Sequence, residues 1–349
     1  MRDVAIVSFA QSTKARETRN EVEILMPVVQ EAVKRSRLPR HEIGFTCSGS
    51  SDYLQGQSFA FVGALDAVGA WPPIKESHVE MDGAWALYEA WIKIQTGDVD
   101  SALVYSFGKS SPGDLPEILA LQLDPYTMTP LWPDANSLAA LQARAYLEAT
   151  GKSERDLAQV VARSRRDALS NRHAVVAGEV DVEKLLLEPY VCSPLRAHDL
   201  PPITDGASAV VVVAGELARK LCPRPVWIRG FDHRIEPLGL GLRDLTRSAS
   251  TEIAAQKAGV HKGKVDFAEL HAPYSHQELI LRAALGLGGD VVINPSGGAL
   301  ASHPLMAAGL IRIGEAADRI MAGRGDRAVA HATQGPCLQQ NLVCVLEGD

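Results

Sequence analysis

The sequence lacks most of the features that mark membrane, disulfide-rich or nucleic-acid-binding proteins. Its five cysteines are widely spread without a CxxC pair, so neither a disulfide framework nor a zinc site is indicated. No apolar run approaches the roughly 20 uncharged residues that cross a bilayer. With a net charge of -7 and no basic block, nucleic acid is not an expected partner. Residues 1–10 carry a charge inside an apolar run, which predicts a strand rather than a signal peptide, and we expect a cytoplasmic protein.

What the chain does have is apolar residues and length. A hydrophobic content of 46% over 349 residues supports a large core and exceeds what one typical domain needs. We therefore expect two similar units. The first covers residues 1–222, with a loop insertion at about 110–200, and the second covers residues 223–349.

The strongest internal pattern occurs twice. Residues 79–108 read as an apolar approach, a polar corner, a helix that stops at a glycine, and a buried strand. Residues 294–335 repeat this order, with a helix predicted over 305–321. Asp100-Ser101-Ala102 and Asp326-Arg327-Ala328 occupy matching places before the two strands, which indicates a duplicated unit.

Each of the two predicted helices begins at a polar corner. The first corner is Glu80-Met81-Asp82-Gly83, and the second runs from Asn294 to Pro304 through Gly297-Gly298. A buried helix directs its free N–H groups toward such a corner. Two corners brought together predict a pocket that stabilises negative charge.

Two other segments bear on function. Residues 110–136 are rich in Pro, Asp and Ser, and a loop of this length predicts a lid or an interface segment. The predicted helix 153–171 carries Arg163 and Arg166. These arginines have two readings, a solvated face or contacts to the phosphates of a nucleotide-bearing substrate.

At three places the chain resembles the thiolase superfamily, and within it the sterol carrier protein X and lipid-transfer-protein group. The similar segments are Glu269-Leu270-His271-Ala272-Pro273-Tyr274, Asn294-Pro295-Ser296-Gly297-Gly298 with Ser302-His303-Pro304-Leu305, and Thr204-Asp205-Gly206-Ala207. The resemblance covers essentially the whole chain. It implies an α/β fold with duplicated βαβαβαββ halves in a five-layer αβαβα arrangement, a dimer across the first-half sheet, and acyl-CoA substrates.

The chain departs from the family at the residues that attack the substrate. The nucleophilic cysteine of thiolases falls at Glu80, and a second family cysteine falls near Gly335. Cys337 lies two residues further on. His303 matches the histidine of the family's GHP motif, although one residue is missing between Gly298 and His303. A carboxylate does not replace a thiolate as an acyl carrier without a change of mechanism.

Without a nucleophile, the resemblance implies a site that binds a CoA thioester and stabilises its enolate. His271 and His303 are candidate proton carriers. Such a site performs a retro-aldol cleavage of a 3-hydroxyacyl-CoA, as aldolases of the lipid-transfer-protein group do in steroid side-chain breakdown. Those enzymes have tyrosines at the two corners and need a small OB-fold and zinc-ribbon partner, which the resemblance implies here too. No tightly bound cofactor and no metal are expected.

Each candidate residue also has a structural interpretation. The histidines are also suited to capping a helix or satisfying a strand end, Tyr274 is suited to packing, and Asp82 is suited to N-capping. Glu80 and Asp82 are a candidate carboxylate pair with one raised pKa. The candidate catalytic residues are His303, His271, Glu80, Tyr274, Asp82 and Cys337; the candidate CoA contacts are Arg163, Arg166, Gly297 and Gly298.

Three functions remain open from the sequence. The first is the retro-aldol lyase, working as a homodimer or as a heterotetramer with the small partner. The second is an acetyl-CoA acyltransferase that recruits Cys337 or another thiol. The third is a silent subunit that supplies only an interface or half of a pocket.

Overall fold

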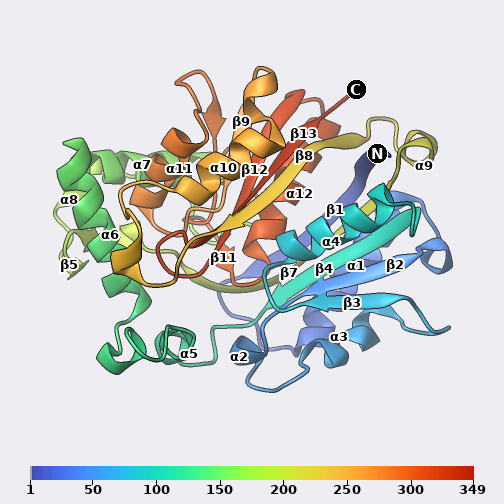
Figure 1. Cartoon of the computed structure of the whole chain (residues 1–349), viewed down its shortest axis with the longest axis horizontal. Helices are drawn as coiled ribbons and strands as arrows, with labels where there is room; N and C mark the ends of the chain where they lie inside the picture. Colours follow the sequence, from blue (N-terminus) through green and yellow to red (C-terminus); the bar gives the residue numbers. More distant parts are fainter. Residues whose placement is uncertain (1) are drawn as a thin grey trace.

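The computed structural model describes residues 2–349, and its two halves have matching strand orders. Within these residues the main sheet follows the path β10-β9-β12-β13-β8-β1-β7-β4-β2-β3, and the short β11 pairs with β7. Read from its outer edge, the first half has the order β3-β2-β4-β7-β1, and the second half has β10-β9-β12-β13-β8. The half-sheets, whose strands are labelled in Figure 1, are joined by two residue pairs between β1 and β8.

The bounds of the elements follow the chain in three groups. The first half contains β1 (Val4–Lys14), α1 (Glu21–Ser36), β2 (Phe45–Gly49), α2 (Asp52–Gln55), α3 (Phe61–Val68), β3 (Glu76–Val79), α4 (Gly83–Gln95), β4 (Ser101–Gly108) and, after the insertion, β7 (Ile203–Ala214). The insertion contains α5 (Leu115–Leu121), α6 (Ala135–Thr150), α7 (Glu154–Asp167), α8 (Val182–Leu186), β5 (Tyr190–Cys192) and β6 (Leu195–Arg196). After α9 (Gly215–Leu221), the second half contains β8 (Val226–Ile235), α10 (Ala249–Ala258), β9 (Phe267–Leu270), α11 (Ser275–Ala284), β10 (Val292–Ile293), β11 (His303–Pro304), α12 (Ala308–Met321), β12 (Arg327–Gln334) and β13 (Gln340–Glu347).

The packing of the hydrophobic core shows that the helices and sheets form five layers. Along β7, Val210 and Val212 pack with α4 and α12 in one hydrophobic cluster, whereas Val211 and Val213 pack with α1 and α3 in another. This alternation is the period of two that a strand imposes on its side chains. The outer face of the second half packs against α10 and α11. The layers are therefore helices, sheet, α4 with α12, sheet, and helices, which confirms the predicted αβαβα fold.

Local sequence explains most of the element ends. Asn20 and Glu23 form a capping box at the start of α1, and Ser153 with Asp156 does the same for α7.

Two predicted bounds are wrong. The segment 110–136 contains the helix α5 where we predicted only loop, and α12 begins at Ala308 rather than residue 305, because His303 and Pro304 pair with β7 as β11.

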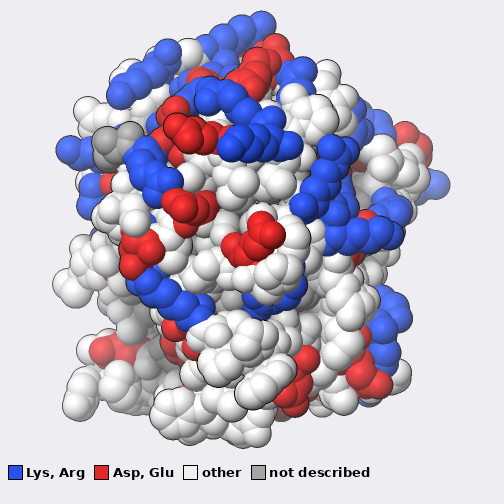
Figure 2. Space-filling model, turned by 90° about the vertical axis from the view of Figure 1, so that its right-hand side faces the viewer, with Lys and Arg blue, Asp and Glu red and all other residues white. Residues whose placement is uncertain are grey.

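The surface carries charges of both signs. On the face in Figure 2, basic and acidic side chains are intermixed over the upper part, and the lower part is mostly uncharged. None of the helices in residues 2–349 combines the length and the apolar character that crossing a bilayer requires.

Two helical glycines provide a matched test of this packing. A Cβ at Gly314 of α12 would lie 2.1 Å from the Phe9 ring, whereas a Cβ at the exposed Gly63 of α3 meets nothing within 4 Å. We predict that Gly314→Ala lowers the free energy of unfolding by about 1–3 kcal/mol through overpacking. Gly63→Ala should raise it by up to about 1 kcal/mol, since alanine restricts the unfolded chain. Urea unfolding measures both, and equal effects would contradict the tight packing of α12 on β1.

Candidate functional site

Two predicted histidines meet inside the protein. His271 directly follows β9, and His303 forms β11 just before α12. Their Nε2 atoms lie 2.9 Å apart, and the residues are 4% and 8% exposed. The fold therefore brings together side chains that are 32 residues apart in the sequence. We call them the histidine pair.

The surrounding hydrogen bonds define the tautomers of the histidine pair. The backbone N–H of Thr333 donates to Nδ1 of His271 over 3.2 Å. The ring proton of neutral His271 is therefore on Nε2, and it donates to Nε2 of His303. His303 then carries its proton on Nδ1. Its backbone N–H donates to Oγ1 of Thr204, so the first half of the chain holds a second-half histidine in place.

Burial makes both members of the pair weak bases. It lowers the pKa of His303 to about 4, with the positive charge of Arg312 acting in the same direction. The pKa of His271 also lies well below its ordinary value, mainly because of burial and then because of His303. Both rings are therefore neutral near pH 7, able to accept and donate one hydrogen bond each.

Asp82 occupies the place where the two central helices begin. Its carboxylate accepts from the N–H of Ala84 at 2.9 Å, at the start of α4, and from those of Gly309 and Leu310 at 2.8 and 3.0 Å, at the start of α12. Burial raises the pKa of Asp82 to about 6, and the three N–H donors oppose this shift. Both helix starts meet as the sequence predicted, but these N–H groups hold the protein's own carboxylate.

Glu80 makes its polar contacts at the edge of the first-half sheet, near β3. Its Oε1 accepts from the N–H of Asp52 at 2.6 Å, and its Oε2 lies 3.3 Å from Nε2 of His78. The side chain is 48% exposed. Nδ1 of His78 in turn lies 2.9 Å from Oγ of Ser48. The hydrogen bonds of Glu80 are therefore to β3 and the start of α2, and those of Asp82 are to α4 and α12.

Comparison with known proteins agrees with this architecture. No family model matches the chain. It is 32% identical to benzoylsuccinyl-CoA thiolase subunit BbsB of Thauera aromatica over 50% of this chain and 51% of that protein. It is 26% identical to an acetyl-CoA acetyltransferase of Methanocaldococcus jannaschii, over 90% and 89% of the two chains. With sterol carrier protein 2 of Bos taurus the identity is 24%, over 93% and 67%. The chain spans about half the length of the relatives that it matches at 30% identity or more.

Solved structures show the same fold. The Ltp2-ChsH2(DUF35) aldolase has a TM-score of 0.83 at 18% identity, covering 99% of this chain and 98% of that chain. Human mitochondrial 3-ketoacyl-CoA thiolase has a TM-score of 0.78 at 15% identity over 99% and 98%. The chain has the thiolase fold, and its sequence is similar to thiolases and to sterol carrier protein 2. The resemblance read from the sequence is thereby confirmed, as is the thiolase fold.

Two further candidates contact the insertion, the half-buried Tyr274 and the buried Cys337. The hydroxyl of Tyr274 donates to Oδ1 of Asn136 at 3.0 Å, and burial raises its pKa. The thiol of Cys337 donates to the carbonyl of Leu138 at 3.3 Å, and burial raises its pKa to about 12. Cys337 is therefore a protonated thiol near pH 7, whereas an acyl carrier requires the thiolate.

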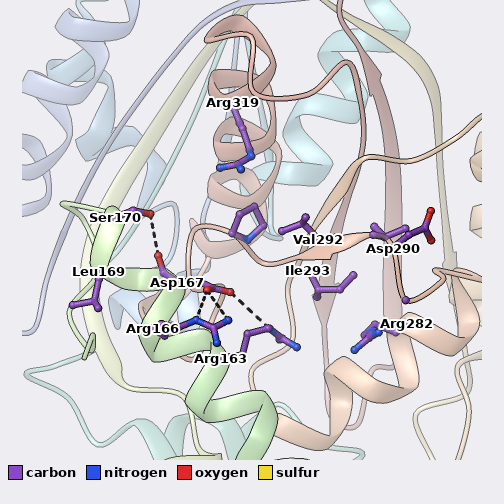
Figure 3. Close-up of a pocket in the computed structure, with 13 residues that line it drawn as sticks. Arg163, Arg166, Asp167, Leu169, Ser170, Arg282, Asp290, Val292, Ile293 and Arg319 are labelled. Atoms are coloured by element: carbon purple, nitrogen blue, oxygen red, sulfur yellow. Dashed lines mark hydrogen bonds and ion pairs between the residues drawn. The ribbon is translucent and has the colours of Figure 1, made fainter. Parts of the chain in front are cut away.

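The predicted CoA contacts lie where α7 packs on the second half. Arg163 donates to Glu278 at 2.6 Å. Arg166 donates to Asp167 at 3.1 Å (Figure 3). Gly297 accepts a hydrogen bond from Ser164 through its carbonyl. At Gly297 a Cβ would lie 2.6 Å from that of Ala168, and at Gly298 it would lie 2.9 Å from the Asn294 side chain. The absence of side chains at these two glycines thus allows the neighbouring segments to pack closely against them. Contact of the glycines with CoA remains a prediction.

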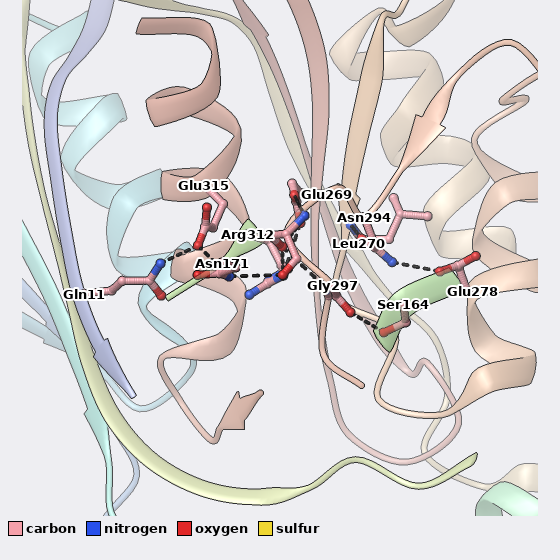
Figure 4. A network of polar contacts seen from close by, with 12 residues as sticks. Gln11, Ser164, Asn171, Glu269, Leu270, Glu278, Asn294, Gly297, Arg312 and Glu315 are labelled. Carbon is pink, nitrogen blue, oxygen red and sulfur yellow. Dashed lines mark hydrogen bonds and ion pairs between the residues drawn. The ribbon is translucent and has the colours of Figure 1, made fainter. Parts of the chain in front are cut away.

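A buried polar network that we did not predict connects α12 with three other segments. Arg312 pairs with Glu269 of β9 at 3.1 Å, and both are almost fully buried (Figure 4). Burial raises the pKa of Glu269 to about 7, and Arg312 opposes this shift. One turn along α12, Glu315 accepts from Gln11 of β1 and from Asn171 of the insertion. The signal available in the sequence was Arg312, which lies among Leu310, Ile311 and Ile313 in the predicted helix 305–321.

Asp82 can be tested against an ordinary helix cap. We predict that Asp82→Ala lowers the free energy of unfolding by about 3 kcal/mol or more, because three buried N–H groups lose their acceptor. The control is Asp134→Ala, which removes the more exposed N-cap of α6 and should cost about 1 kcal/mol. Urea unfolding at pH 7.5 compares the two variants. A loss no larger than that of the control would contradict the role of Asp82 in joining two helices.

Proposed function

We propose that the chain cleaves a 3-hydroxyacyl-CoA by a retro-aldol reaction at the histidine pair. The observation that carries this proposal is the contact of two buried, neutral imidazoles at a helix start, with no thiolate beside them. The relatives are named as acyl-CoA enzymes, and one structural neighbour is named as an aldolase. Together these favour carbon–carbon bond cleavage without an acyl-enzyme.

The tautomers assign a role to each histidine. Substrate binding replaces the bond within the histidine pair by two bonds to the substrate. The Nε2–H of His271 then donates to the thioester oxygen, and the Nε2 lone pair of His303 becomes available to the β-hydroxyl. The N–H groups at the two helix starts are bonded to Asp82 and do not donate to the substrate. In this assignment the side chain of His271 supplies the hydrogen bond to the thioester oxygen instead.

The chemistry then balances without a further reactant. Nε2 of His303 removes the proton of the β-hydroxyl, the Cα–Cβ bond breaks, and its electron pair forms the thioester enolate. The β-carbon leaves as an aldehyde or ketone. The proton held by His303 returns to Cα, which gives a shortened acyl-CoA and the starting state of the histidine pair. The CoA thioester is the substrate, and no step uses a resident cofactor.

Assembly belongs to the proposal as well. The strand β3 lies at the open edge of the first-half sheet, and Phe59, Val62 and Trp71 close to it in sequence are more than half exposed. An edge strand with apolar neighbours is suited to pairing with a second copy. The Ltp2-ChsH2(DUF35) aldolase is named for two components. We therefore propose that the chain forms a homodimer. We propose further that this homodimer assembles with a small OB-fold and zinc-ribbon protein into a heterotetramer.

The silent subunit is the second candidate, and Asp82 is the observation that favours it. By filling both helix starts, Asp82 removes the N–H groups that a substrate oxygen would otherwise approach. The acyltransferase is less well supported, because the thiol of Cys337 is buried and protonated.

Variants of the histidine pair distinguish the lyase from the silent subunit. We predict that His303→Ala and His271→Ala each lower kcat/KM by about 100-fold or more, as expected for loss of general acid–base catalysis. His276→Gln is the matched control, since His276 is a buried, neutral histidine bonded to Gln142. The assay measures carbonyl product and shortened thioester from a 3-hydroxyacyl-CoA panel, using the chain with any co-purifying partner. Full activity of both alanine variants in that complex would establish a silent subunit.

The pH dependence follows from the sign of the pKa shift. A lowered pKa means that His303 stays neutral, and thus a base, down to about pH 4. We predict that kcat/KM is nearly constant from about pH 8 to about pH 5, whereas an ordinary histidine would protonate near pH 6.5. A midpoint near pH 6.5 would contradict the assignment. Circular dichroism must accompany the assay, because buried neutral histidines lose stability as the pH falls below about 6.5.

A further inference from the structure

A cavity of about 670 Å³ opens beside the C-terminal end of α7, away from the histidine pair. Four arginines line it, namely Arg163, Arg166, Arg282 and Arg319 (Figure 3). They come from α7, α11 and α12, so tertiary packing alone gathers them.

The cavity and the histidine pair lie at opposite ends of α12. The histidine pair precedes the first turn of this helix, and Arg319 lies in its last turn. A helix of 14 residues is about 20 Å long. The guanidinium of Arg319 also lies 5.3 Å from the centre of the Phe267 ring, at the start of β9, whereas His271 follows the end of that strand. The cavity is therefore separate from the site proposed for cleavage.

Two of the four arginines are already neutralised. Arg163 pairs with Glu278, and Arg166 pairs with Asp167. In residues 2–349, by contrast, neither Arg282 nor Arg319 has a carboxylate within ion-pair distance.

The remaining polar groups leave the cavity positive. Nε of Arg319 is buried without a hydrogen-bond partner in the part of the chain that the structure describes. The lining contains two carboxylates, those of Asp167 and Asp290, against four guanidinium groups. Figure 3 shows the Asp290 carboxylate at the far edge, turned away from Arg319. The guanidinium groups of Arg282 and Arg319 therefore line the cavity without an ion-pair partner, and an anionic ligand would supply one.

We propose that this cavity binds a phosphate-bearing small molecule, held by Arg282 and Arg319. Guanidinium groups match phosphate oxygens in two-pronged hydrogen bonds, and two free arginines suit a ligand with more than one negative oxygen. The cavity volume is within the range of ordinary small-molecule sites. The ligand is an inorganic phosphate or the phosphates of a nucleotide, which share this chemistry.

The test is calorimetric titration of the full chain with pyrophosphate and with ADP at about 50 mM salt, where screening is modest. We predict saturable binding that weakens at least about tenfold in Arg282→Gln and in Arg319→Gln, because each loses a charge-assisted bond. Glutamine keeps part of the apolar stem in place. The matched control is Arg229→Gln, an exposed arginine paired with Asp3 and Glu347 outside the cavity. His303→Ala should bind as the unmodified chain does.

Each outcome has a defined meaning. Tighter binding of ADP than of pyrophosphate identifies a nucleotide site, and equal binding identifies a phosphate site. The proposal is overturned if the unmodified chain binds neither compound, or if both glutamine variants bind as well as the control. Thermal melting verifies folding, and Arg282→Gln decides the question if Arg319→Gln does not fold. Because the readout is binding, the result does not depend on whether the histidine pair is catalytic.

Discussion

The carboxylate of Asp82 is the acceptor on which the arrangement of the two halves depends. One carboxylate accepts N–H groups from the first turns of both α4 and α12, which form the central layer between the half-sheets. Each helix start carries partial positive charge from its unpaired N–H groups, and two such starts facing each other would repel. The negative charge of Asp82 satisfies both. It lies in the core at 2% exposure, so the halves cannot separate without exposing unpaired donors.

This arrangement has a chemical consequence. A helix start is an effective place to stabilise negative charge only while its N–H groups are free. Since Asp82 already accepts three of them, the proposed reaction needs side chains to stabilise the substrate anion. The histidine pair meets that requirement in a buried setting where one neutral ring donates and the other accepts. Thr204 of the first half accepts the backbone N–H of His303, and the backbone N–H of Thr333 in the second half bonds to the His271 ring, so both halves position the histidine pair.

The second half is also stiffened by buried charge. The pair between Arg312 and Glu269 connects α12 to β9 just before His271, and Ser296 bonds to both partners. Buried ion pairs contribute little net stability, because desolvation offsets their attraction, but removing one partner leaves a buried charge. The same guanidinium lowers the pKa of both histidines. The network thus fixes α12 against β9, and its positive charge adds to the effect of burial, which is the main cause of the low pKa of both histidines.

By itself, the sequence indicated the α/β class, the duplicated unit and the N-cap at Asp82, because hydrophobic period, helix caps and glycine stops act within a few residues. The five-layer fold came from the resemblance of three motifs to the thiolase superfamily. The sequence also singled out His271 and His303, each directly after or before a predicted element. Only the tertiary structure decided which residues meet. The contact of the histidine pair, the reach of Asp82 to α12 and the bond of Glu80 to Asp52 each join segments at least 28 residues apart. Such contacts depend on how whole elements pack, and no local pattern encodes the direction in which a side chain meets a distant partner.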